Sequence, residues 1–175
     1  KRSDEDALRN YVATLAQREL AYPPGKGWGY TDAAFNVLGA AIESITGKKY
    51  LDYMHEEVLK KAGMGESMFW RPGPGEDGAS PHTGKVFVRR QGSYPWDRAM
   101  MPSSGLNSSI NDMTHWAALH VNRNPALLSA ASYEAMFKHH LDSSWDGIAM
   151  GLGWQLEKRG DRWLPRHYGQ EDGFT

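Results

Sequence analysis

The stretch from Thr31 to Gly47, TDAAFNVLGAAIESITG, carries the strongest structural signal in the chain. Thr31 suits the N-cap position, because its hydroxyl can accept a hydrogen bond from an amide that the first turn of a helix leaves unpaired. The apolar residues that follow recur at helical spacing, namely Phe35, Leu38, Ile42 and Ile45. Gly47 stands where a left-handed residue commonly ends a helix. The pattern predicts an amphipathic helix between these two caps.

Two further helices are expected beside this one. The first spans roughly residues 4–20 and begins at a capping box formed by Ser3 and Asp6. The other has a buried apolar stripe within residues 51–59 and follows the central helix almost at once. The central helix and the later one therefore form a compact hairpin.

The middle of the chain changes character. Residues 65–104 are rich in Pro, Gly and charge and are expected to form a long loop, broken by a strand-like run at 85–89. Loops of this length in compact domains are usually functional or poorly ordered. Helical patterning resumes at a second capping box, from Ser109 to Asp112, and again over residues 132–140.

The last part of the sequence indicates strands. Residues 151–157 and 162–167 have strand-like patterns and are joined by a turn at Arg159-Gly160-Asp161. Helices followed by strands predict an α+β fold. We expect one partial domain over residues 1–175, with a mostly helical region over 4–140 and late sheet strands over 149–175.

Composition excludes several classes of partner and chemistry. The chain has 175 residues, and its 20 Lys and Arg nearly balance its 21 Asp and Glu. No global basic surface follows, so neither nucleic acid nor an anionic membrane bound through overall charge is expected. No apolar run approaches the ~18 to 20 residues that span a bilayer. The absence of cysteine excludes disulfides, thiol nucleophiles and Cys-ligated zinc.

The histidines do not form a recognisable metal motif. His115 and His120 are five residues apart and His139 and His140 are adjacent, so neither pair shares the face of a helix. Gly73-Pro74-Gly75 lacks the Lys-Ser/Thr that follows a phosphate-binding loop. We therefore expect no metal and no cofactor.

The remaining candidates for chemistry are Tyr30 and His167. Tyr30 stands at the mouth of the central helix, just after Trp28, in a glycine-rich turn that can expose side chains at a rim. His167 ends a strand, and Gly169 beside it would let a ligand lie along the backbone. Each residue alone could be purely structural, so their significance depends on whether they meet.

Four groups of residues occur in an order that points to one enzyme family. They are Pro24-Gly25-x-x-Trp28-x-Tyr30-Thr31-Asp32 with Leu38-Gly39-x-x-Ile42-Glu43-x-x-Thr46-Gly47 and Gly63-Met64, then Met101-Pro102-Ser103-Ser104-Gly105-Leu106-Asn107-Ser108-Ser109-Ile110-Asn111-Asp112-Met113, then Gly151-Leu152-Gly153-Trp154, then His167-Tyr168-Gly169-x-x-x-Gly173-Phe174. This series resembles the central part of serine β-lactamases and penicillin-binding proteins. More narrowly it resembles class C-like serine hydrolases and esterases.

The resemblance implies roles for individual residues. Tyr30 matches a tyrosine that moves protons to and from the nucleophile, and its phenol would need a nearby cation to act as a base. His167 matches the Lys or His that closes the site, with Gly169 beside the acyl group. The amide of Gln170 would donate to the oxyanion. Trp28 lies in the same motif and is expected near the substrate.

Asp32 departs from the family pattern. The corresponding residue is often Asn, and a carboxylate there would repel a carboxylate-bearing substrate. This departure weakens a β-lactam or peptidoglycan interpretation.

The family nucleophile, a Ser-x-x-Lys motif, does not occur in this sequence. Thr46-Gly47-Lys48-Lys49 has the right spacing with threonine but falls at a predicted helix end. The resemblance places the nucleophile and the first strands before Lys1, and a strand and helix after Thr175. The expected fold is thus a β-lactamase/DD-peptidase-like fold truncated at both ends.

Two interpretations remain open. Either the chain is the central part of a serine hydrolase that cleaves an ester, amide or β-lactam through an acyl-enzyme, or it is a non-catalytic fragment or helical binding and assembly module. In the first, the partner is a small-molecule acyl substrate, whose identity depends on loops such as 65–104. Unpaired strand edges would favour self-association or a complementary segment. Export is usual among such enzymes, which implies a periplasmic or secreted location.

Overall fold

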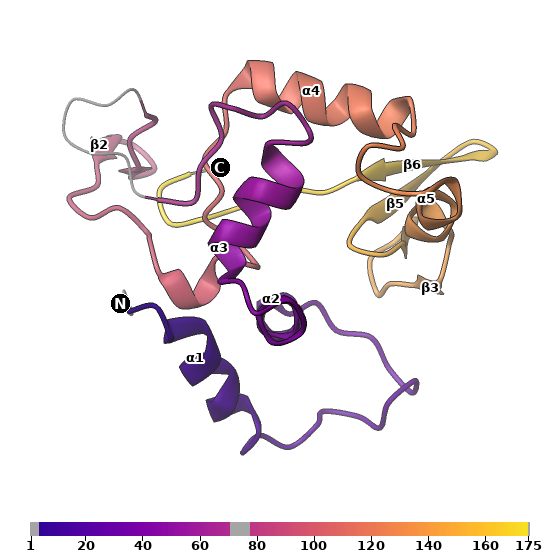
Figure 1. The fold of residues 1–175 in the computed structure, drawn as a ribbon, viewed down its shortest axis with the longest axis horizontal. Helices are drawn as coiled ribbons and strands as arrows, with labels where there is room; N and C mark the ends of the chain where they lie inside the picture. The colour runs from indigo at the N-terminus through magenta and orange to yellow at the C-terminus, as the bar shows by residue number, and fades with distance from the viewer. Residues whose placement is uncertain (1–3, 71–77, 175) are drawn as a thin grey trace.

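The computed structural model describes residues 4–70 and 78–174 and has the α+β architecture that the sequence predicts (Figure 1). A helical region contains α1 (Ala7–Leu15), α2 (Asp32–Thr46), α3 (Tyr50–Tyr53), the π-helical η1 (Met54–Leu59), the 3-10 helix η2 (Arg98–Met100), α4 (Ile110–Val121) and α5 (Ala130–Phe137). Its core gathers residues from nearly the whole region, from Leu8 on α1 to Tyr133 on α5.

The central helix forms where the sequence predicts it. The Thr31 hydroxyl accepts a hydrogen bond from the Ala33 amide at 3.2 Å, and Gly47 adopts a left-handed φ of 71°. The Gly47 amide donates to the Glu43 carbonyl at 2.9 Å. Both predicted caps of α2 are therefore confirmed.

The first helix is shorter than expected. α1 ends at Leu15, and Leu20, the last residue of the predicted range, is exposed. Residues 16–20 are mostly polar and are exposed, so a longer helix would bury no further apolar surface. Of the predicted capping box, Ser3 lies outside the described residues, and the Asp6 side chain makes no capping hydrogen bond. It pairs instead with Lys49 at 2.9 Å.

The third predicted helix continues without a break from α3 into η1. The switch to π-helical bonding is visible in the Lys60 amide, which donates to the His55 carbonyl at 3.0 Å. The Met64 amide closes the exit by donating to the Leu59 carbonyl at 2.9 Å. Leu59 and Met64 are both buried, so the wider turn still places its apolar residues in the core.

The cap at Ser109 is confirmed, but the predicted box is not reciprocal. The Ser109 hydroxyl accepts from the Asp112 amide at 3.1 Å. The Asp112 carboxylate instead accepts from the Glu66 amide at 2.9 Å and the Ser67 hydroxyl at 2.7 Å. This carboxylate thereby ties α4 to the chain that leaves η1.

The strand predicted at 85–89 is wrong in its placement. The strands are β1 (His82–Thr83) and β2 (Arg89–Arg90), which pair antiparallel around a five-residue turn over 84–88. Gly84 has a φ of +117°, and a Cβ there would lie 2.1 Å from the Phe87 carbonyl oxygen. A tight turn therefore occupies the β-branched run that reads as a strand.

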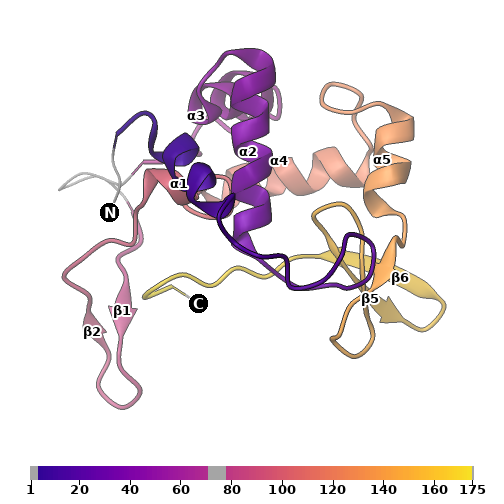
Figure 2. The same ribbon diagram turned by 90° about the horizontal axis from the view of Figure 1, so that it is seen from below.

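The late strands form an antiparallel sheet in the order β3-β4-β5-β6 (Figures 1 and 2). They are β3 (Leu141–Asp142), β4 (Ile148–Met150), β5 (Gln155–Arg159) and β6 (Arg162–Arg166). Residues 151–154, predicted as strand, form the turn before β5, closed by the Gly151 amide donating to the Trp154 carbonyl at 2.8 Å. β6 ends at Arg166, immediately before His167.

Candidate functional site

A cavity of about 660 Å³ lies where the start of α2, the turn after η2 and the segment after β6 converge. Five of the six residues singled out in the sequence line it: Tyr30, Asp32, His167, Gly169 and Gln170. They come from two segments more than 130 positions apart in the sequence. The fold therefore brings these two segments of the sequence together at one cavity.

Tyr30 and His167 lie side by side at this cavity. Their ring centroids are 6.1 Å apart with an interplanar angle of 38°. The Thr31 cap fixes the backbone just after Tyr30, and β6 fixes the backbone just before His167. Both side chains line the cavity, so a ligand there can touch both.

Trp28 is the predicted site residue that does not line the cavity. It packs edge-on against Trp145, with centroids 5.0 Å apart, and Trp145 in turn lies 5.7 Å from the ring of Tyr30. A row of rings thus runs from Trp28 through Trp145 and Tyr30 to His167. Trp28 supports the site from behind rather than contacting its contents.

Sequence reasoning missed Trp145. It lies in the turn between β3 and β4, where its amide donates to the Ser143 hydroxyl at 3.0 Å and its carbonyl accepts from the Ile148 amide at 3.1 Å. These bonds fix the backbone that carries the indole against Tyr30. The signal available in the sequence was an aromatic residue in a polar turn, which by itself does not reveal where the turn folds.

The surroundings of Tyr30 favour the neutral, protonated form of its phenol. Partial burial raises the pKa of Tyr30 above its ordinary 10.0, and the negative charge of Asp32 raises it further. Both effects disfavour the phenolate. Tyr30 can therefore serve as a proton donor in this chain, whereas action as a base requires a cation that these neighbours do not supply.

A second part of the cavity lining was also missed as part of the site. It is formed largely by the turn over residues 101–106, which the sequence matched to the family without assigning any contact to it. Pro102 of this turn packs so closely on α2 that a Cβ on Gly39 would lie 2.3 Å from its ring. Ser103 and Ser104 both donate to the Met100 carbonyl, at 3.0 and 3.4 Å. Their hydroxyls are thus engaged by backbone and have no lysine three residues on.

The segment leaving β6 is anchored next to the site. Arg166 pairs with Glu157 on β5 and donates to the Tyr168 hydroxyl at 2.9 Å. Its guanidinium also lies 4.5 Å from the Tyr168 ring centroid. These contacts on both sides of His167 hold the backbone from which Gly169 and Gln170 face the cavity.

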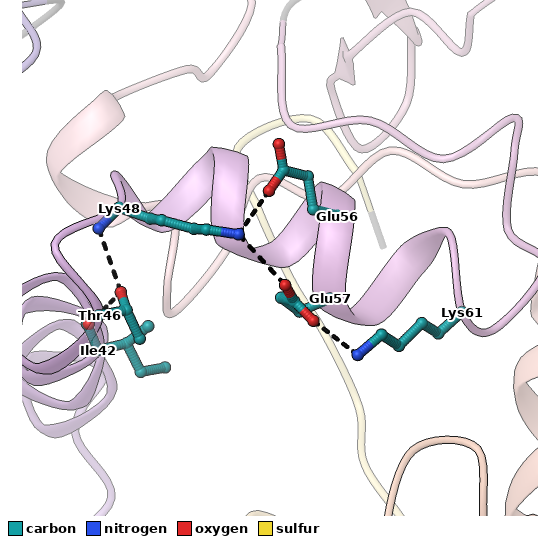
Figure 3. Close-up of polar contacts among 6 residues, drawn as sticks. All are labelled: Ile42, Thr46, Lys48, Glu56, Glu57 and Lys61. Atoms are coloured by element: carbon teal, nitrogen blue, oxygen red, sulfur yellow. Dashed lines mark hydrogen bonds and ion pairs between the residues drawn. The ribbon is translucent and has the colours of Figure 1, made fainter.

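The threonine motif does not form a site. Thr46 lies at the far end of α2, roughly 20 Å along the helix axis from Asp32, and its hydroxyl donates to the Ile42 carbonyl at 2.7 Å. Lys48 extends away from it toward two glutamates (Figure 3). The ion pairs are Lys48–Glu56 at 2.6 Å, Lys48–Glu57 at 3.2 Å and Lys61–Glu57 at 2.6 Å. Lys49 is paired with Asp6.

Residues 4–70 and 78–174 were also considered for a metal centre and for a membrane-spanning helix, and they contain neither. Within them, no group of three or more His, Asp or Glu side chains is arranged to hold a metal ion. In the same ranges, no helix has the length and hydrophobicity needed to cross a bilayer.

Comparison with known proteins places the chain in a family. The Beta-lactamase family model matches residues 1–175, and the chain belongs to this family. It is 24% identical over 152 residues to the D-alanyl-D-alanine-carboxypeptidase/endopeptidase AmpH of Escherichia coli, a match that covers 80% of this chain and 38% of AmpH. It is 25% identical to the unguisins hydrolase ungD' of Aspergillus campestris, over 96% of this chain and 33% of that protein. The chain thus spans about a third of the length of these relatives.

Solved structures support the same fold. The octameric penicillin-binding protein homologue from Pyrococcus abyssi superposes with a TM-score of 0.77 at 22% identity, covering 85% of this chain and 35% of that one. A D-stereospecific amidohydrolase from Streptomyces gives a TM-score of 0.77 at 18% identity, covering 95% and 50%. The chain therefore has the fold of part of a penicillin-binding-protein-like domain.

Proposed function

We propose that this chain supplies the proton-transfer and acyl-binding part of a β-lactamase-like serine hydrolase. The observation that carries the proposal is the pairing of Tyr30 with His167, 6.1 Å apart on a cavity that Gly169 and Gln170 also line. The nucleophile would come from a segment that precedes these residues in a longer protein. That the chain spans about a third of its relatives is consistent with this arrangement.

The proposed chemistry is acyl transfer through a serine ester. The Tyr30 phenol would first give its proton to the lysine of the Ser-x-x-Lys motif. The serine oxygen then attacks the substrate carbonyl while its own proton passes to the Tyr30 oxygen. The oxyanion accepts hydrogen bonds from the Gln170 amide and from the amide of the serine itself. The proton then returns to the leaving alcohol or amine, and water releases the acid by the reverse sequence. His167 closes the site beside the acyl group.

The cationic partner is a requirement of this proposal. Burial and Asp32 both raise the pKa of Tyr30, so the phenol alone is far from its working protonation state at neutral pH. A lysine ammonium close to the phenol oxygen would lower that pKa. The Ser-x-x-Lys segment would therefore supply both the nucleophile and the charge that activates Tyr30.

The isolated chain tests the location of the nucleophile. We expect it to show no burst with an activated ester such as p-nitrophenyl acetate and no labelling by a fluorophosphonate probe. Stoichiometric labelling of any serine among its 175 residues would overturn the proposal.

The longer protein tests the role of Tyr30. Tyr30→Phe should lower kcat/KM by a factor of about 10² to 10⁴, the usual worth of a positioned proton-transfer group. Tyr11→Phe, on α1 and away from the cavity, is the matched control and should leave the rate unchanged. Equal rates for both variants would show that the phenol at position 30 transfers no proton.

The Asp32 carboxylate makes neutral acyl compounds the favoured substrates. It lines the cavity, where its charge would oppose a substrate carboxylate. In the longer protein, Asp32→Asn should improve the hydrolysis of an anionic ester relative to a neutral one. If both substrates respond equally, the charge argument fails.

A non-catalytic role is the second candidate, favoured by the absence of Ser-x-x-Lys from the sequence. In that case the cavity would bind an acyl compound without turning it over. Strand edges left unpaired would favour self-association or a complementary segment, and the octameric relative from Pyrococcus abyssi makes self-association a reasonable proposal. Light scattering of the isolated chain distinguishes a monomer from an assembly.

A further inference from the structure

The β1–β2 hairpin is the most exposed apolar feature of the described residues that the proposed hydrolase site does not use. Figure 2 shows it extending away from the helices, with the turn over 84–88 at its far end. Val86, Phe87 and Val88 in this turn are 84%, 75% and 68% exposed. Neighbouring apolar side chains so accessible to water usually mark an interaction surface.

Cations surround these apolar residues. Lys85 precedes them and Arg89 and Arg90 follow them, and all three are exposed. No acidic residue occurs in the sequence between Gly78 and Trp96. Among the described residues, none of the three cations forms an ion pair. The chain has a net charge of −1, so this local concentration of positive charge is a property of the hairpin and not of the whole molecule.

The hairpin is held in a defined position. Gly84 packs against the Phe87 carbonyl, a contact that any Cβ would prevent. At the base, the Gln91 amide donates to the Pro81 carbonyl at 2.7 Å and the His82 amide donates to the Gly173 carbonyl at 2.9 Å. The tip is therefore presented by a fixed support and needs little further ordering to bind.

We propose that the tip of the β1–β2 hairpin docks on the surface of an anionic lipid bilayer. Val86, Phe87 and Val88 would enter the interfacial region, and the flanking cations would contact lipid phosphates and acidic headgroups. A stable protein interface covers about 800 Å² on each partner, far more than three side chains provide. A bilayer needs only an apolar tip and complementary charge. Lys85, Arg89 and Arg90 provide the charge.

Two acidic residues limit how the hairpin can approach. Glu171 and Asp172 line a cavity of about 810 Å³ together with His82, Thr83 and Lys85, between the hairpin base and the C-terminal segment. Their charges would oppose a deeper approach to an anionic surface. The proposal therefore predicts tighter binding when both carboxylates are neutralised by Glu171→Gln and Asp172→Asn.

Co-sedimentation of the chain with lipid vesicles tests the proposal. We expect binding to vesicles that contain phosphatidylglycerol, much weaker binding to pure phosphatidylcholine, and loss of binding at high salt. Arg89→Gln and Arg90→Gln should each weaken binding about five-fold, the value of one cation near an anionic surface. Val86→Ser should weaken it about ten-fold.

A matched valine elsewhere on the surface distinguishes specific lipid binding by the hairpin from nonspecific hydrophobic adsorption. Val121 at the end of α4 is 81% exposed, so Val121→Ser removes a valine of equal accessibility and should leave vesicle binding unchanged. The chain has no cysteine, so Val86→Cys and Val121→Cys each provide a single site for an environment-sensitive dye. Vesicles should shift the dye emission to shorter wavelength at position 86 only.

Three results would overturn the proposal. They are the absence of binding to phosphatidylglycerol vesicles at low salt, an equal response at positions 86 and 121, and a blue shift at position 86 that depends on protein concentration without lipid. The last result would show that another copy of the chain covers the tip.

Discussion

Two aromatic clusters of similar composition lie in different surroundings in this molecule. Beside His167, the rings of Tyr30, Trp145 and Trp28 form a row, and Tyr30 and His167 at its end line a cavity. Around His120, the rings of Trp116, Tyr133, Phe137 and Trp154 lie 4.3 to 6.0 Å from the imidazole and close it in. Residue types alone do not separate a site from a core; access and polar partners do.

The two histidines at the centres of these clusters differ in their access to solvent and ligand. Both ring nitrogens of His120 are buried without a hydrogen-bond partner among the described residues, and burial lowers the pKa of this histidine. His167 is exposed and lies where a ligand can reach it. The imidazole of His120 is therefore enclosed in the packed interior, whereas His167 lines an open cavity.

The largest contrast is expected from truncating one residue of each cluster. Tyr133 is fully buried, so Tyr133→Ala should lower the free energy of unfolding by about 3 to 5 kcal/mol. His167→Ala should change it by less than about 0.5 kcal/mol, because an exposed side chain leaves no cavity. Urea unfolding monitored by tryptophan fluorescence measures both. A large loss for His167→Ala would make that cluster structural.

A smaller effect is expected where α2 supports the cavity wall. Gly39→Ala would place a Cβ 2.3 Å from the Pro102 ring and force the 101–106 turn outward. Overpacking of this kind typically costs about 1 to 3 kcal/mol. The matched control is Gly65→Ala, because no atom lies within 4 Å of the new Cβ there. Similar melting temperatures for the two variants would refute the close contact.

The pH dependence of stability should come from the buried histidine. The folded pKa of His120 lies below its ordinary 6.5, so the unfolded chain binds its proton more readily. The contribution of His120 is fully present above pH 6.5, is lost as the pH falls through 6.5 toward the lower folded pKa, and then levels off. His120→Phe should flatten this part of the curve. An unchanged pH dependence in His120→Phe would contradict the role assigned to the buried histidine.

The smallest expected effect concerns the phenol itself. Trp145→Ala exposes Tyr30 and Asp32→Asn removes a negative charge, so each should lower the pKa of Tyr30 back toward 10.0. Titration of the isotope-labelled Tyr30 ring by NMR measures the shift. If Asp32→Asn leaves the pKa unchanged, Asp32 does not act on the site through its charge.

Local signals were enough to predict much of the fold. Thr31, Gly47 and Ser109 act through hydrogen bonds within a few residues, so their caps can be read from the sequence. The run at 85–89 misled because β-branched residues also fit a turn when glycine precedes them, as Gly84 does here. The length of α1 depended on whether the folded chain provides an apolar surface that could bury Leu20. A local sequence pattern does not contain that information.

The sequence alone singled out Tyr30 and His167 as candidates, and the family resemblance added the prediction that they belong to one site. Tyr30 and His167 are separate signals in the sequence and meet only because β6 runs back toward the start of α2. Trp145 was missed since its place beside Tyr30 depends on the turn between β3 and β4. The cationic hairpin was hidden by a composition that balances to −1 over the whole chain.

Detecting the contact between Tyr30 and His167 in solution is the most direct test of the proposed acyl site. Nuclear Overhauser effects between their ring protons can be measured on the isolated chain with selectively labelled tyrosine and histidine. Centroids 6.1 Å apart predict clear cross-peaks between these rings and from Tyr30 to Trp145. Cross-peaks from Tyr30 to Trp145 but none to His167 would place the imidazole elsewhere and contradict the account.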